Sequence, residues 1–290
     1  MGIDIENEMK NQSSSCPACC QWYLEHVIYQ CKYLLRKRVD YVLNAQLQWL
    51  KHRRANPKQA DVTAPFMKYP SLITNYLEVF TTSTEYSFID QFYKQLTTSL
   101  IDWLETNVIA QNQKYTDVLR IINFSYLSDA VSEIKLRRSI PPSIDTCLLF
   151  MSERIGESRI SYVKWMIWYE FPLLTSINDR FGNSLMSDKV NLCDLSLFVT
   201  RNEVASLGNS SNGELTSKSV RSKVTCMKKR FQKHFNSTLN TSDNYISIWR
   251  MIKEKFLVIL QRIHESSTVS YQLSFQSAMD AAVISFGIDL

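Results

Sequence analysis

The stretch that decides the fold class is QWYLEHVIYQCKYLLRKRVDYVLNAQLQWLKHRR, residues 21–54. Within it Ile28, Leu35, Val42 and Trp49 recur every seven residues, and other apolar residues widen this stripe. The spacing places them along one side of an α-helix. Because the stripe is broader than the two-position seam of a coiled coil, the stretch predicts a long helix of a bundle.

The scarcity of turn residues extends this prediction to the whole chain. The 290 residues include only six glycines and seven prolines, whereas average proteins contain about 7% Gly and 5% Pro. Strand-rich chains need glycine for their tight turns. The sequence therefore predicts an all-α protein, either a multi-helix bundle or a helical-rod segment, with a long N-terminal amphipathic helix.

The same apolar periodicity predicts further helices. Prolines at 57, 65 and 70 predict a connector without helix over residues 52–70. Beyond it, helices are expected at about 71–80, 84–104, 115–138, 145–171, 173–181, 188–207, 218–236, 243–265 and 268–286. In the fourth of these, SYVKWMIWYEF is apolar on nearly every side, so Trp165 and Trp168 are expected to be buried in the core.

Composition suggests four segments. Residues 1–15 are polar and predict a disordered N-terminal tail, followed by a helical bundle over residues 16–207. The sequence GNSSNGELTS, residues 208–217, is typical of a flexible linker. Residues 218–290 then predict a C-terminal three-helix segment packed on the bundle.

The net charge of +5 is modest, but cations are concentrated in one predicted helix. Residues 218–233 contain no acid, and the apolar residues of this region fall at helical spacing. Such a helix binds nucleic acid, an anionic membrane surface or an acidic protein, or else it is the solvated face of a bundle helix. The seven candidate residues for binding an anionic partner are Lys218, Arg221, Lys223, Lys228, Lys229, Arg230 and Lys233.

A second basic stretch covers residues 28–58 and includes the KHRR end of the first helix. Cations at a helix C-terminus are favoured by the helix dipole, which accounts for that end without a partner. Arg38 falls within the apolar stripe, so it is expected either to extend its charge into water or to pair with an acid.

The seven cysteines are odd in number and irregular in spacing, which favours a reducing compartment, the cytoplasm or the nucleus. The CPACC sequence offers Cys16, Cys19 and Cys20 as candidate metal ligands or lipidation sites. Zinc sites usually combine two such pairs, and a second pair at that spacing is missing from the sequence. Exposed thiols without a function are therefore the favoured interpretation, and neither a metal nor another cofactor is expected.

The sequence lacks the common catalytic motifs, including the nucleophile elbow, the P-loop and the paired E-x-x-H of di-iron bundles. Its four histidines are far apart. We therefore expect a non-enzymatic interaction or scaffold protein with protein partners, and its long helices resemble those of tethering and trafficking complex subunits at the level of fold alone. The alternatives are a nucleic-acid-binding protein that uses helices 28–58 and 218–236, and a helical enzyme without a known motif. The sequence contains no run of 18 apolar residues, so no membrane span is predicted.

Overall fold

The computed structural model describes residues 18–54, 61–80, 86–109, 113–137, 140, 142–185, 214–235, 243–265 and 269–287. Nearly all of these residues are helical, and none of them forms a strand. The prediction of an all-α multi-helix bundle is therefore confirmed. The chain divides into two compact units, Met1–Gly156 and Glu157–Leu290, and the helix α6 contributes to both.

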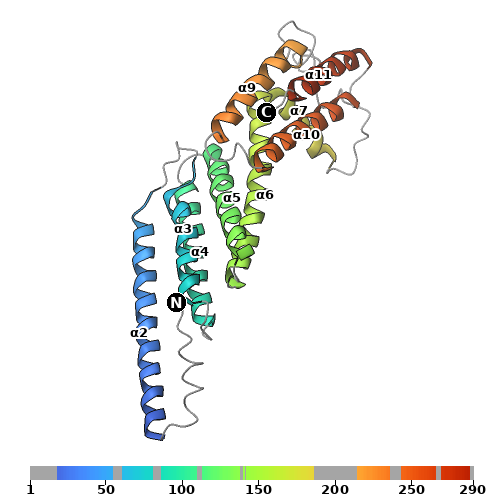
Figure 1. The fold of residues 1–290 in the computed structure, drawn as a ribbon. Helices are drawn as coiled ribbons and strands as arrows, with labels where there is room; N and C mark the ends of the chain where they lie inside the picture. Colours follow the sequence, from blue (N-terminus) through green and yellow to red (C-terminus); the bar gives the residue numbers. More distant parts are fainter. Residues whose placement is uncertain are drawn as a thin grey trace. The chain divides into compact units, whose positions relative to one another are not determined.

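The described residues of unit 1 form four helices and the first part of a fifth (Figure 1). α2 packs against α4, while α3 packs against both α4 and α5. These helices are α2 (Ala18–Lys51), α3 (Ala64–Phe80), α4 (Tyr86–Ile109), α5 (Gln113–Arg137) and α6 (Pro142–Glu170). α6 begins beside α4, where the Asp90 carboxylate accepts a hydrogen bond from the backbone N–H of Ser143 at 3.0 Å. An acceptor at this position satisfies one of the free N–H groups of the first helical turn.

The connector predicted over residues 52–70 is shorter than expected, because α3 begins at Ala64 and continues through Pro70. Pro65 lies in the first turn, where its missing N–H is not needed. An interior proline costs about 3 kcal/mol. Burial of Phe66, Ile73 and Leu77 on one side of α3 contributes about 1.5–3 kcal/mol per side chain. This burial outweighs the cost of Pro70, so the prediction of a connector without helix is wrong for residues 64–70.

Unit 2 contains the second part of α6 with α7 (Pro172–Leu185), α9 (Ser217–Phe235), α10 (Asp243–Glu265) and α11 (Val269–Gly287). α11 packs against α9 and α10, and α10 packs against α7. An aromatic cluster fills the core between α6, α9 and α10. Its centre is Tyr162, whose hydroxyl forms a 2.9 Å hydrogen bond with the His234 Nδ1 atom and whose ring meets Phe235 edge-on.

The expectation that α6 is buried on every side is wrong at Trp168, whose side chain is 56% exposed. Trp165 is half-buried. Tyr162, Val163, Met166 and Ile167 are the buried residues of this part of α6. They follow a helical period, so this part of the helix buries one side only. Aromatic composition alone does not distinguish that side from the exposed one.

Several predictions fall on residues outside the described ranges, among them the N-terminal tail, the helix at 188–207 and residues 208–213 of the linker. The end of the predicted linker is described, and it is packed. Leu215 is buried, and Thr216 accepts a hydrogen bond from the Ser219 N–H, which makes Thr216 the N-cap of α9. The predicted segment boundary at 208–217 stays a prediction.

Candidate functional site

The basic helix α9 packs into unit 2 through one apolar side. Its buried residues are Val220, Val224, Met227, Phe231, His234 and Phe235. The spacing follows the helical period, as the sequence predicted. The seven candidate cations therefore lie on the rest of the helix surface, where the structure divides them into two groups.

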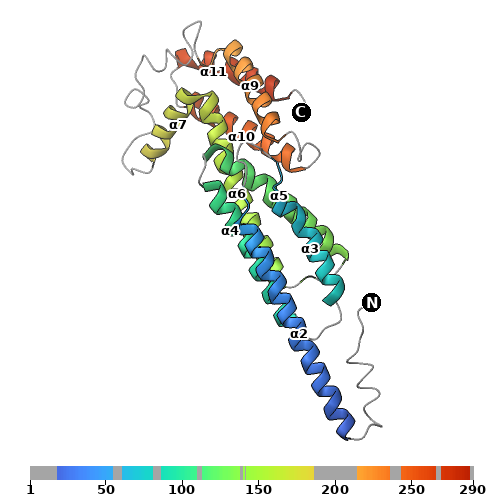
Figure 2. The same cartoon turned by 90° about the vertical axis from the view of Figure 1, so that its left-hand side faces the viewer.

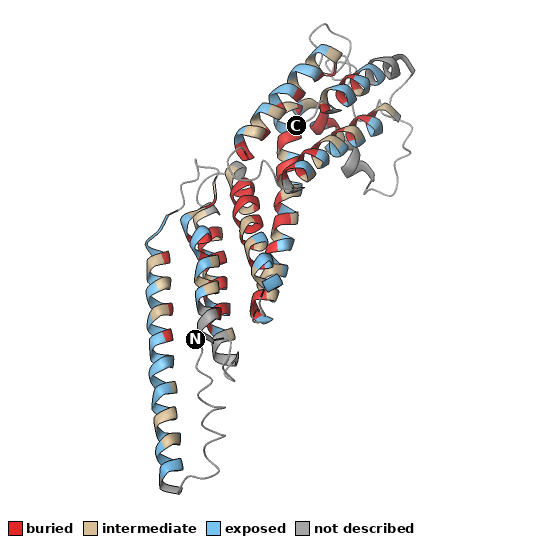
Figure 3. Cartoon of the chain, in the orientation of Figure 1, coloured by how far each residue is buried: buried red, intermediate tan, exposed pale blue. Residues whose placement is uncertain are grey.

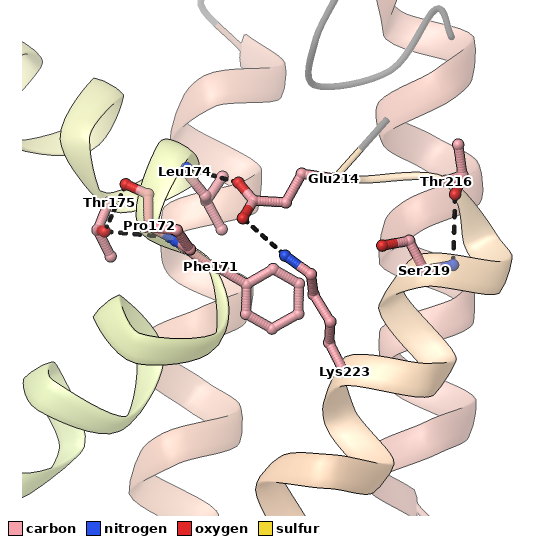
Figure 4. A network of polar contacts seen from close by, with 8 residues as sticks. All are labelled: Phe171, Pro172, Leu174, Thr175, Glu214, Thr216, Ser219 and Lys223. Atoms are coloured by element: carbon pink, nitrogen blue, oxygen red, sulfur yellow. Dashed lines mark hydrogen bonds and ion pairs between the residues drawn. The ribbon is translucent and has the colours of Figure 1, made fainter. Parts of the chain in front are cut away.

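Lys223 belongs to the first group, because it pairs with an acid of the same unit (Figure 4). Its Nζ atom donates a 2.8 Å hydrogen bond to Glu214, and Glu214 also accepts the backbone N–H of Leu174 at 3.0 Å. The Glu214 side chain is only 8% exposed. The ammonium also lies 4.9 Å from the centre of the Phe171 ring. One carboxylate thus caps the first turn of α7 and holds α9 beside it.

Arg230 is used in the same way. Its guanidinium forms an ion pair with Glu170 at the end of α6 and lies 3.9 Å from the centre of the Tyr169 ring. Arginine commonly combines an ion pair with stacking on an aromatic ring. Arg230 and Lys223 therefore bind α9 to its neighbours within unit 2.

The second group remains at the surface. Lys218, Arg221, Lys229 and Lys233 are exposed, whereas Lys228 is half-buried. At about 100° per residue, the four exposed cations share one side of α9. The seven predicted residues therefore do not form one uniform binding surface, and the available basic face of α9 consists of these four residues.

Among the described helices, α2 carries the most exposed large apolar side chains, and all but one of them lie in its first part. Every described side chain from Cys20 to Arg38 is exposed or half-buried, and burial begins at Val39 (Figure 3). In both orientations, this end of α2 extends past the ends of α3 and α4 (Figure 2). We call residues 20–38 the α2 segment. Its large exposed apolar side chains are Trp22 (68% exposed), Tyr23 (64%), Tyr29 (65%), Tyr33 (45%), Leu34 (62%) and Leu35 (47%).

The aromatic side of the α2 segment was not predicted from the sequence. Of the predicted stripe, Leu35 is exposed, whereas Ile28, Val42 and Trp49 are half-buried. The buried residues in the described part of α2 are Val39, Leu43 and Leu50. Trp22, Tyr29 and Tyr33 form a second stripe on another side of the helix. Their spacing of seven and four residues was the signal that could have revealed it. Cys31 is exposed in this part of the helix.

The cations of α2 lie against its own aromatic rings. Lys37 Nζ is 4.6 Å from the centre of the Tyr33 ring, and the Arg38 guanidinium is 5.4 Å from that of Tyr41. Arg38 is exposed, in agreement with the expectation that its charge reaches water. At the KHRR end, Arg53 lies over the Trp49 ring, and its carbonyl accepts the Trp103 indole N–H at 2.9 Å. The described residues of α2 therefore combine aromatic and basic groups along the helix.

The candidate metal ligands are only partly covered by the structure. Cys16 and the side chain of Cys19 lie outside the described residues, while Cys20 is exposed and unoxidised. Within the described ranges, no group of three or more His, Cys, Asp or Glu side chains is placed to hold a metal ion. The interpretation of CPACC therefore stays a prediction.

Unit 1 contains two open cavities. One, of about 400 Å³, lies between α2, α3 and α4 beside Trp49, Lys68 and Tyr69. The other, of about 540 Å³, lies between α4 and α6, and its polar lining includes Asp90, Lys94, Asp102 and Cys147. Burial raises the pKa of the Cys147 thiol, while the Thr98 hydroxyl and the Lys94 charge lower it. Asp90 already accepts the hydrogen bond that caps α6.

Comparison with known proteins adds no assignment. No family model matches the chain, and neither a curated protein nor a solved structure is significantly similar to it. Among the described helices, none has a stretch both long and apolar enough to cross a bilayer. The functional argument therefore rests on the surfaces described above.

Proposed function

We propose that this protein is a non-enzymatic interaction module and that the α2 segment is its contact surface. The observation that carries the proposal is the exposure of six large apolar side chains along one helix. The aromatic residues among them leave on the order of 500 Å² of apolar surface in water. The largest contiguous apolar patch on a typical soluble monomer is about 300–600 Å² and is often an interaction site. The α2 segment exposes a comparable total area, divided between different sides of the helix.

The composition of the segment supports the same conclusion. Interfaces are enriched in Trp, Tyr and Arg, and these residues also dominate the binding energy. The segment combines one Trp, three Tyr and two Arg within 19 residues. A reducing compartment, proposed from the irregular cysteine pattern, agrees with the unpaired exposed thiols of Cys20 and Cys31.

The test compares co-purification from native cells between the parent chain and the variant Trp22→Ser/Tyr29→Ser/Tyr33→Ser. We expect the variant to lose the bound proteins, because several aromatic anchors are removed, and to keep its helical content, because all three side chains are exposed. The matched control, Leu136→Ser/Leu149→Ser, changes exposed apolar residues of α5 and α6. Equal co-purification by all three proteins would refute the proposal.

A second candidate function is favoured by the exposed face of α9. Lys218, Arg221, Lys229 and Lys233 present four positive charges on one side of the helix. Such a face attracts nucleic acid, and binding of that kind weakens steeply with salt. The test is a salt titration with duplex DNA: binding that is lost in Lys218→Glu/Lys229→Glu/Lys233→Glu supports this function, and its absence from the parent chain at low salt rejects it.

A further inference from the structure

The α2 segment has two apolar sides that face in opposite directions. At about 100° per residue, Trp22, Tyr29 and Tyr33 project within about 40° of one another. Cys31, Leu34 and Leu35 are centred on the opposite side of the helix, and these six residues are all exposed. A helix that covers one flat surface needs a single apolar side. Two opposite apolar sides indicate that the segment is contacted from two directions.

Positive charge is also spread around the segment. Residues 20–38 contain Lys32, Arg36, Lys37 and Arg38 but a single acid, Glu25. Lys32 and Arg36 share one side of the helix, Lys37 and Arg38 project to two other sides, and all four lie within seven residues. A binding surface for this segment therefore needs apolar walls and negative charge near residues 32–38.

This charge pattern disfavours a second copy of the same chain. Parallel pairing of two segments would place the two basic runs against each other, which is unfavourable. In antiparallel pairing, each basic run of four cations meets only the partner's Glu25 as a counter-charge. A lipid bilayer also fits poorly, because an interfacial helix keeps its charges on the side opposite its apolar residues.

Resting on the proposed function, we infer that the α2 segment is inserted as a helix into an apolar groove of a partner protein, with Asp and Glu side chains on the groove's rim. This is the helix-in-groove mode of recognition, in which anchors repeat at helical spacing. The 19 residues of the segment span about 28 Å. Burial from two sides is compatible with the roughly 800 Å² that each partner contributes to a stable interface.

The test places a photo-crosslinking residue, benzoylphenylalanine, at position 29 or position 31 of the full chain in native cells. The side chains of Tyr29 and Cys31 project to opposite sides and are both exposed. We expect both positions to crosslink to the same partner chain, at two separate segments with Asp or Glu nearby. Lys37→Glu/Arg38→Glu should lower both crosslinking yields about tenfold, because the reversed charges would repel an acidic rim.

The matched control is Lys229→Glu/Lys233→Glu, which makes the same change of net charge on the exposed face of α9 and should leave the yields unchanged. Three results would overturn the groove proposal. They are crosslinks from only one of the two positions, crosslinks to a second copy of the chain, and crosslinking yields that are unchanged by the charge reversal at positions 37 and 38. The groove proposal would also be overturned if the purified chain sedimented with phosphatidylcholine–phosphatidylserine vesicles and the vesicles shielded Tyr29 and Cys31 from water. Failure of both positions to crosslink to any protein would contradict the proposed function as well.

Discussion

Replacing Lys223 by Met tests whether the basic character of α9 is partly structural. The change removes the ammonium but keeps the apolar stem beside Phe171. It leaves the Glu214 carboxylate, 8% exposed, with the Leu174 N–H as its remaining described partner. Loss of a charge-assisted hydrogen bond of this kind costs about 2 kcal/mol. With a urea dependence of about 2 kcal/mol per molar, the unfolding midpoint of unit 2 should fall by about 1 M.

The assay is urea unfolding followed by circular dichroism, with a double-mutant cycle through Glu214→Gln. The double variant has no unpaired buried carboxylate at position 214, so its loss of unfolding free energy should be smaller than the sum of the two single losses by about 1–2 kcal/mol. Lys229→Met is the matched control, since Lys229 is exposed, and it should change stability by no more than about 0.5 kcal/mol. Equal effects of the Lys223 and Lys229 substitutions would refute the structural role of Lys223.

Three further predictions follow from the same contacts. Gly156→Ala should stabilise α6 by about 0.4–1 kcal/mol in urea unfolding, because an added Cβ meets no atom within 4 Å; destabilisation would contradict this. Burial raises the pKa of Tyr162 well above 10.0, so the unfolded state loses its proton first and stability should fall as pH rises above 10. Tyr162→Phe should lower the free energy of unfolding by about 1 kcal/mol at neutral pH, but it should reduce the further loss of stability above pH 10. An unchanged dependence of stability on pH would contradict the role of the Tyr162 hydroxyl. Cys147 is half-buried and should react with a thiol reagent more slowly than Cys20, Cys31 and Cys226, the exposed cysteines among the described residues. Equal rates measured by mass spectrometry would contradict this partial burial.

The helices were largely predictable because apolar periodicity is a local property of the sequence. The predicted helix at 218–236 and the observed α9 differ by one residue at each end. Pro70 was misjudged because its cost is local, whereas the burial of Phe66 and Ile73 that offsets it comes from the packing of α3. Tertiary packing commonly overrides such local preferences.

The division of the basic residues could not be predicted from the sequence. Arg230 pairs with Glu170 across 60 positions, and Lys223 pairs with Glu214 from a segment that the composition marked as a linker. A count of charges in one helix cannot reveal such partners. The exposure of the α2 segment was equally hidden, since the heptad through Ile28 and Leu35 continues unchanged from the packed part of α2 into the exposed part.

The most direct test of the interaction surface is amide hydrogen exchange across residues 20–38, in the purified chain and in the complex isolated from native cells. Most helical stability in proteins comes from tertiary packing, and residues 20–38 include no buried side chain, so their amides should exchange faster in the purified chain than those of the packed part of α2. The account predicts at least about tenfold slower exchange in the complex, with the amides of the buried side of α9 unchanged as an internal reference. Equal exchange of the α2 segment in both samples would contradict its role as the contact surface.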